Sequence, residues 1–158
     1  MSPESCRHGM PPDRCSLCKA PPGDHYELRR GSFEGNPVVE IMKNGGPVHR
    51  HDEHFRFGLE KARLLLVAEP VIDQFLQAGD QFSLARRTLT DPERQTTMVA
   101  WVQLEPEFVR STGETLDRPY LYLESQRSSA RIGIGYEKAK ALRAVRAELR
   151  AWVAKPAG

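Results

Sequence analysis

The chain has 158 residues, of which 39% are hydrophobic, and its formal net charge at pH 7 is +2. This length and composition fit one compact domain with a small appendage, and they exclude a disordered or fibrous chain. The sequence has no apolar run of membrane-spanning length and no basic or apolar export signal at its start, so we expect a cytoplasmic protein.

All three cysteines lie near the N-terminus, close to a histidine. Cys15 and Cys18 have the C-x2-C spacing that lets two thiolates bind one Zn²⁺ ion from a tight turn, and Cys6 and His8 can provide the other two ligands. Such a closed set leaves no coordination position for a substrate. We therefore predict a structural zinc site in a zinc-knuckle-like leader, residues 1–19. The alternative is a leader with three free cysteines.

The globular part is expected to begin after a stiff, polar linker, residues 20–25. Residues 26–33 and 36–43 are predicted strands, the second because of its alternating apolar pattern. The Asn-Gly-Gly sequence at 44–46 predicts a tight turn, since both residue types accept positive φ. Residues 47–57 would form the returning strand.

A segment of the first half is repeated near the C-terminus. Residues 58–76 read GLEKARLLLVAEPVIDQFL, residues 135–153 read GYEKAKALRAVRAELRAWV, and the two align without a gap. Each follows a short alternating strand, so the repeated unit is a strand, a glycine and a helix with an apolar stripe. We therefore predict one globular domain of two repeats, residues 26–79 and 80–158.

The two predicted helices differ at one position that affects the backbone. Pro70 removes a hydrogen-bond donor, so the first copy is expected to be a strand or a short helix through Ala68, followed by a second helix with Pro70 in its first turn. The second copy has Ala147 at that position, so it is expected to run straight. Phe75 and Trp152 occupy equivalent positions and are predicted core residues.

The second half repeats the order of elements. Strands are predicted over residues 82–89, 97–104, 119–125 and 131–134, and residues 105–117 are interpreted as an inserted loop because they show no clear period. The predicted fold class is α+β, with two tandem ββββα-like repeats that form antiparallel sheets with helices on one side.

Positive charge is concentrated at the C-terminal end. From Arg127 onward there are eight Lys or Arg residues and two Glu residues, so the rest of the chain is net acidic. Arg143, Arg146 and Arg150 fall on one flank of the second repeated helix, which we interpret as a solvent-exposed face.

The open side of the predicted sheet is the candidate binding surface. Because Phe55 and Phe57 are expected to face the helices, the residues alternating with them point to solvent, where arginines and tyrosines can contact phosphates and stack on bases. The same open face is expected to carry one arginine of each neighbouring pair, Arg29 or Arg30 and Arg86 or Arg87. It also carries either the tyrosines or the leucines of PYLYLES. The candidate residues are Arg30, His54, Arg56, Arg86, Tyr120, Tyr122 and Arg131. The alternative is that the arginines serve solubility alone.

The sequence HRHDEH at residues 49–54 resembles the metal motifs of cupins and of metallo-β-lactamase-like hydrolases. A metal-dependent enzyme using His49, His51 and Glu53 is therefore an alternative function. On a regular strand His54 points away from the other two histidines, and no histidine follows it. Nucleophile-elbow, Walker A and dinucleotide-binding motifs are missing, and a protein-interaction module is the third possibility.

The duplicated unit resembles the single-stranded-nucleic-acid-binding superfamily of Pur-alpha repeats, Whirly proteins and the positive-cofactor-four coactivator. The likeness lies in VVEIM, FRFGLEKARLLL and IDQFL of the first half and in YLYLES, RIGIGYEKAKAL and LRAWV of the second. In that superfamily the sheets carry nucleic acid and helices mediate packing or dimerisation. The resemblance implies that residues 54–56 and 120–131 lie near a bound strand. We therefore predict a regulatory or accessory protein that binds single-stranded DNA or RNA without catalysis, with a homodimer as one expected assembly.

Overall fold

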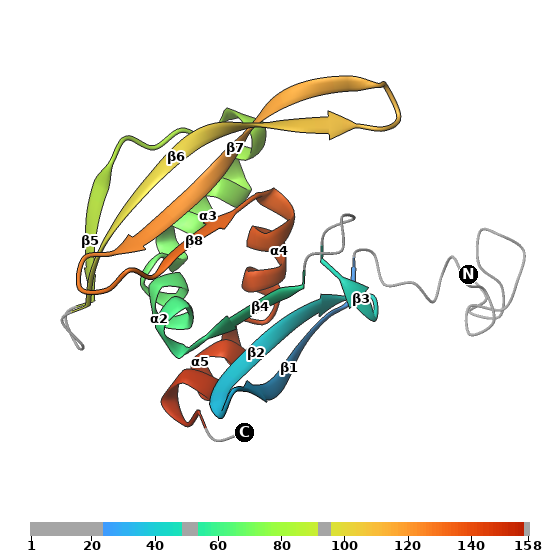
Figure 1. The fold of residues 1–158 in the computed structure, drawn as a ribbon. Helices are drawn as coiled ribbons and strands as arrows, with labels where there is room; N and C mark the ends of the chain where they lie inside the picture. Colours follow the sequence, from blue (N-terminus) through green and yellow to red (C-terminus); the bar gives the residue numbers. More distant parts are fainter. Residues whose placement is uncertain (1–23, 49–53, 92–95, 157–158) are drawn as a thin grey trace, which may run out of the picture.

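The computed structural model describes residues 24–48, 54–91 and 96–156. Over these residues the chain is an α+β fold with two antiparallel sheets and four α-helices (Figure 1). None of the described helices is long and apolar enough to cross a membrane. Two groups of predicted metal ligands lie outside the described residues: Cys6, His8, Cys15 and Cys18 of the leader, and His49, His51 and Glu53 of the alternative site.

The first sheet contains β1 (Tyr26–Phe33), β2 (Asn36–Lys43), β3 (Gly46–Pro47) and β4 (Phe55–Gly58). Strand β2 is central, because β1 pairs along one edge and β3 and β4 pair along the other. The predicted bounds of β1 and β2 are confirmed. The turn after β2 contains a positive φ of 52° at Asn44, as the Asn-Gly-Gly signal predicts.

The second sheet has the order β5 (Arg87–Asp91), β6 (Thr96–Val109), β7 (Glu114–Ser125) and β8 (Arg131–Ile134). The last of these strands matches its predicted range. The strand predicted over residues 82–89 is wrong in its first half, because β5 begins only at Arg87. Phe82 is instead buried, and its ring stacks on Phe75 with centroids 4.9 Å apart.

The loop predicted over residues 105–117 is also wrong. Strands β6 and β7 stay paired as far as Val109 and Glu114, with a turn between them that contains Gly113 at a φ of 71°. Figure 1 shows that this hairpin projects beyond the helices. Leu104 and Phe108 are therefore 60% and 56% exposed, although they continue the side of β6 that faces the core. With both faces exposed, the hairpin lacks the alternation that identifies a strand.

The helices form two bent pairs, α2 (Leu59–Val67) with α3 (Glu69–Ala78), and α4 (Tyr136–Ala144) with α5 (Arg146–Ala154). A short 3₁₀ turn, η1 (Gly79–Gln81), follows α3. The predicted break near Ala68 is confirmed, with Pro70 in the first turn of α3. The prediction of a straight second helix is wrong.

The second bend, at Val145, has the same hydrogen bonds as the first. Ala68 donates to Leu64 and accepts from Ile72, at 3.1 and 2.9 Å, and the bonds of Val145 to Ala141 and Leu149 measure 3.2 and 2.9 Å. Both bend residues are buried, at 0% and 2% exposure. Since no proline is present near Val145, packing rather than a missing donor places the bend there.

The helices lie between the two sheets (Figure 1). Helix α2 contacts β4 and also β5 and β7 of the second sheet, while α4 contacts β8 and also β2 of the first. The side chains between these layers form one hydrophobic core, in which Phe75 and Trp152 are 0% exposed. The predicted role of these two residues is confirmed. Each sheet therefore has one face against the helices and one open face.

The basic flank of α5 is not simply a solvated face. Arg146 binds the carboxylate of Asp73 at 2.6 Å and also pairs with Glu69, and Arg150 pairs with Glu69 as well. The hydrogen bond from Arg146 lowers the pKa of Asp73 below its ordinary value. These two arginines connect α5 to α3, and their positive charges are neutralised within the helix layer.

Candidate nucleic-acid interface

The strand register determines which side chains lie on the open face of the second sheet. Directly paired residues of antiparallel strands share a face, and Trp101 of β6 is paired with Tyr122 of β7. Tyr120 lies two residues along the same strand. Leu121 and Leu123, which alternate with the tyrosines, are 0% exposed in the core. The open face therefore carries the tyrosine pair of PYLYLES and not the leucine pair.

Trp101, Tyr122 and Tyr120 form a row of aromatic rings, here called the aromatic platform. The rings of Trp101 and Tyr122 are stacked, with centroids 5.5 Å apart and planes 20° apart. The rings of Tyr122 and Tyr120 follow at 6.3 Å. All three side chains are half-buried, so the row presents partly exposed ring surfaces that are fixed by the strands beneath them.

Two glycines of the adjoining β8 segment provide space for the tyrosine rings. A Cβ atom on Gly133 would lie 2.7 Å from Cε1 of Tyr122, and one on Gly135 would lie 3.1 Å from Cε1 of Tyr120. Real Cβ contacts are rarely this short. The glycines of RIGIG therefore allow the rings to lie against the neighbouring chain.

Two arginines stack on the platform. The guanidinium carbon of Arg86 lies 4.8 Å from the centre of the Trp101 ring, and that of Arg131 lies 5.2 Å from Trp101 and 5.0 Å from Tyr122. A guanidinium that stacks on a ring keeps its in-plane N–H donors available for phosphate oxygens. Among the described residues neither arginine has an ion-pair partner, although Glu124 lies opposite Arg131 in the strand register.

A carboxylate fixes the central ring of the platform. The hydroxyl of Tyr122 donates to Oε1 of Glu105 at 2.6 Å, and Nε2 of Gln103 donates to the same oxygen at 2.9 Å. Burial raises the pKa of Tyr122 to about 12, and the hydrogen bond and negative charge of Glu105 add to this rise. The phenol therefore stays neutral at physiological pH and does not repel a phosphate.

The substitution Glu105→Gln is expected to lower the pKa of Tyr122 from about 12, since it removes the negative charge that opposes ionisation. The pKa of Tyr122 is about 10 in the unfolded chain and about 12 in the folded protein. The contribution of Tyr122 to the free energy of unfolding is therefore lost as pH rises from about 10 towards 12. A pH titration of tyrosinate absorbance measures the shift, with Tyr122→Phe identifying the signal. An unchanged pKa in the Gln variant would show that burial alone sets it.

The open face of the first sheet has a different character. Glu40 lies between Arg29 and Arg56 in the strand register, and its carboxylate contacts Nη2 of Arg56 at 3.1 Å and Nδ1 of His54 at 3.3 Å. Arg29 pairs with Glu27 at 3.2 Å. The side chains of Arg29, His54 and Arg56 on this face are thus bound to carboxylates, and the aromatic side chain among the described open-face positions of β1, β2 and β4 is Phe33 at the end of β1, far along the strand from Arg29 and Glu40.

The predicted binding residues are therefore divided between two surfaces. Figure 1 shows the sheets on opposite sides of the helix layer. Arg30 is paired with the core residue Val39, which places Arg29 and not Arg30 on the open face. Arg87 is likewise paired with the core residue Ala100, so Arg86 joins the platform. The second sheet brings together Arg86, Tyr120, Tyr122 and Arg131, whereas His54 and Arg56 lie on the first.

Trp101 was missing from the sequence-based candidates. It lies in the predicted strand TMVAWVQL, where Met98 and Ala100 are fully buried. The residues that alternate with these two, Val99 and Trp101, face the other way. The period of two along this strand was the signal that could have placed Trp101 beside the tyrosines.

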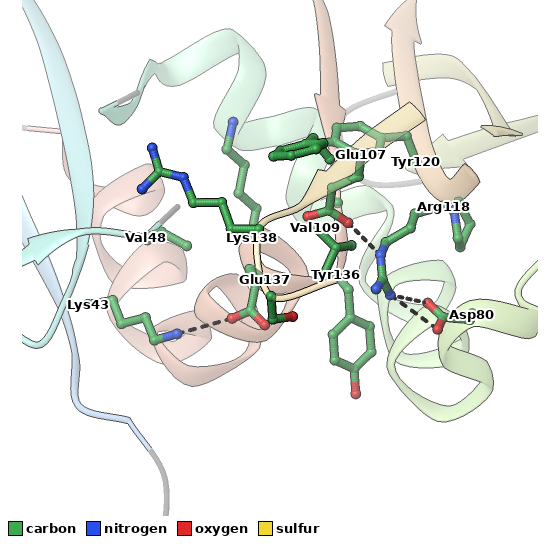
Figure 2. A pocket seen from close by; sticks show the side chains of 15 residues that line it. Lys43, Val48, Asp80, Glu107, Val109, Arg118, Tyr120, Tyr136, Glu137 and Lys138 are labelled. Atoms are coloured by element: carbon green, nitrogen blue, oxygen red, sulfur yellow. Dashed lines mark hydrogen bonds and ion pairs between the residues drawn. The ribbon is translucent and has the colours of Figure 1, made fainter. Parts of the chain in front are cut away.

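A cavity of about 780 Å³ adjoins the platform at Tyr120, below the tip of the β6–β7 hairpin (Figure 2). Its wall includes Tyr120 and residues of β6, β7 and the first turn of α4. Figure 2 shows Arg118 paired with Asp80 and Glu107 on one side and Lys43 paired with Glu137 on the other. The platform and the cavity therefore have the residue Tyr120 in common.

No protein-family model, curated protein or solved structure matches the chain. The relation to the Pur-alpha and Whirly superfamily thus remains a prediction from the sequence. Among the described residues, no group of three His, Cys, Asp or Glu side chains is placed to hold a metal ion. His54, the member of the histidine cluster that the structure describes, contacts Glu40.

Proposed function

We propose that this protein binds single-stranded DNA or RNA on the open face of the second sheet, without catalysis. One observation carries the proposal: three aromatic rings lie in a row, flanked by Arg86 and Arg131, which have no ion-pair partner among the described residues. Every base has a π-face that can stack on such rings, and arginine binds the phosphates between the bases.

The spacing of the rings favours a single strand over a duplex. Their centroids are 5.5 and 6.3 Å apart, wider than the rise of about 3.4 Å between stacked bases of one duplex strand. Trp101 and Tyr122 stack on each other and carry the two arginines, so a base can stack only on the ring surface that remains exposed. The bases of a single strand can unstack to do so, whereas duplex bases do not offer their faces to a protein surface.

We further infer that the two halves are tandem ββββα-like repeats whose sheets have diverged. The inference is supported by the shared order of strands and bent helices, the glycine before each first helix, and the equivalent bends at Ala68 and Val145. In this view the second sheet serves binding, and the first sheet has its cations neutralised by Glu27 and Glu40.

Binding of a fluorescent single-stranded oligonucleotide at several salt concentrations tests the function. We expect affinity to fall steeply with salt, and the double variant Arg86→Gln/Arg131→Gln to weaken binding and to reduce the salt slope by about 1.4, since each phosphate contact on a single strand contributes about 0.7. Fluorescence anisotropy measures both quantities.

The matched control is Arg29→Gln/Arg56→Gln, which removes the same charge from the open face of the first sheet. It should leave affinity nearly unchanged. A larger loss in this control than in the Arg86/Arg131 variant would move the site to the first sheet. Absent or salt-insensitive binding by the unsubstituted protein would contradict nucleic-acid binding and favour a protein-interaction module.

The structural zinc site and the homodimer remain predictions of the sequence. The four proposed ligands, Cys6, His8, Cys15 and Cys18, lie outside the described residues. Bound Zn²⁺ that is lost on mutating Cys15 and Cys18 would support the zinc knuckle. Metal retained in that variant and lost in a His49/His51 double variant would support the metal-dependent enzyme instead.

A further inference from the structure

The cavity beside Tyr120 has the composition of a nucleotide site. Besides Tyr120, its wall includes Phe108 and Tyr136, which are 56% and 39% exposed. Its volume of about 780 Å³ lies in the range of small-ligand pockets, about 300–1,000 Å³. Exposed rings in a concave site of this size suit a planar base.

The charges around the cavity favour an anion over a cation. Arg118 contacts Asp80 at 3.1 Å and also pairs with Glu107, and Lys43 contacts Glu137 at 3.2 Å, so the acidic side chains of the wall are all bound to cations. Arg110 also lines the cavity, is exposed, and has no ion-pair partner among the described residues. A phosphate can bind Arg110 without displacing a carboxylate.

The position of the cavity connects it to the platform. The ring of Tyr120 follows Tyr122 at 6.3 Å on the open face and is also part of the cavity wall. Phe108 lies on the opposite side of the hairpin from the platform, so a strand that passes Tyr120 has to turn around the edge of β7, which β8 pairs only at residues 121–124, to place its next nucleotide in the cavity. No other described residue of the platform lines the cavity.

We propose that the cavity binds a nucleotide of the same single strand, directly beyond the one stacked on Tyr120, with its base against the aromatic wall and its phosphate at Arg110. This inference rests on the proposed function. It makes the projecting β6–β7 hairpin part of the binding site, since the hairpin provides both Phe108 and the adjoining Arg110. It also predicts that affinity depends on whether the strand is long enough to extend past the platform.

The test compares an oligothymidylate of three nucleotides, which can cover the three rings of the platform alone, with one of about ten nucleotides, within the usual range of site sizes. The unsubstituted protein should bind the longer strand more tightly. Phe108→Ala should weaken binding of the longer strand by about tenfold, for the loss of one stacked base, and Arg110→Gln should weaken it and lower its salt slope by about 0.7, for the loss of one phosphate contact. Neither variant should affect the short strand. Trp101→Ala should weaken both.

Two matched controls separate a local effect from a general one. Phe33→Ala removes a phenylalanine that is also 56% exposed, from the first sheet, and Arg63→Gln removes an exposed arginine from α2. Neither should change binding of either strand. Circular dichroism of each variant checks that the fold is retained.

The cavity proposal is overturned if Phe108→Ala and Arg110→Gln bind the longer strand normally while Trp101→Ala clearly loses affinity. The proposed function would then stay in place. If Trp101→Ala binds both strands normally, the proposed function itself fails. Thymidine monophosphate that binds in a manner dependent on Arg110 but independent of Trp101 would also overturn the proposal, because the cavity would then be a separate mononucleotide site.

Discussion

Replacement of Trp101 by alanine is expected to lower the affinity for a single-stranded oligonucleotide by at least about tenfold. One stacked base is worth about 1–3 kcal/mol, and 1.4 kcal/mol corresponds to a factor of ten. The indole also lies beneath the guanidinium groups of Arg86 and Arg131. Its loss therefore removes a stacking surface and releases the two cations from their positions at the same time.

The matched variant Trp101→Phe keeps a ring at the centre of the platform and should recover most of the affinity. Trp101 is only half-buried and lies on the open face, so neither variant should unfold the protein. Titration of a labelled oligonucleotide at fixed salt concentration measures the effect. Equal affinity of Trp101→Ala and the unsubstituted protein would exclude the aromatic platform as the binding surface.

The parts of the fold with strong local signals were predicted correctly. Strands β2 and β8 have alternating patterns bounded by glycine or turn residues, and Pro70 fixes the start of α3 through its missing N–H group. The equivalent core positions of Phe75 and Trp152 followed from the internal repeat. These properties depend on residues close together in sequence.

The errors arose where contacts between distant segments decide the structure. The β6–β7 hairpin lies beyond the helix layer, so exposure of both faces removed the alternation that marks a strand. The bend at Val145 has no proline, and its position coincides with a residue that is 2% exposed in the core, which the local sequence does not indicate. Whether Arg56 is available depends on its pairing with Glu40 across the strand register, which composition does not reveal.

The largest expected effect on stability is that of Trp152→Ala. The side chain is 0% exposed in the shared core, and truncation of a buried aromatic residue costs about 3–5 kcal/mol. Phe75→Ala should have a similar cost, because Phe75 is equally buried at the equivalent position of the first half. Unfolding by urea, followed by circular dichroism, measures both free energies. Wild-type stability in either variant would contradict the shared core.

Trp152→Phe distinguishes aromatic packing from a specific need for the indole. The indole Nε1 of Trp152 is buried and has no hydrogen-bond partner among the residues that the structure describes, and an unpaired buried donor costs about 1–3 kcal/mol. Phenylalanine removes this cost while losing part of the packed surface, so we expect a net destabilisation of less than about 1.5 kcal/mol, as for well-tolerated core substitutions. Phe75 shows that a phenyl ring already fills the equivalent position. If Trp152→Phe is as unstable as Trp152→Ala, the second half of the core depends on the full indole, and the proposed equivalence of the two helix pairs does not extend to their packing.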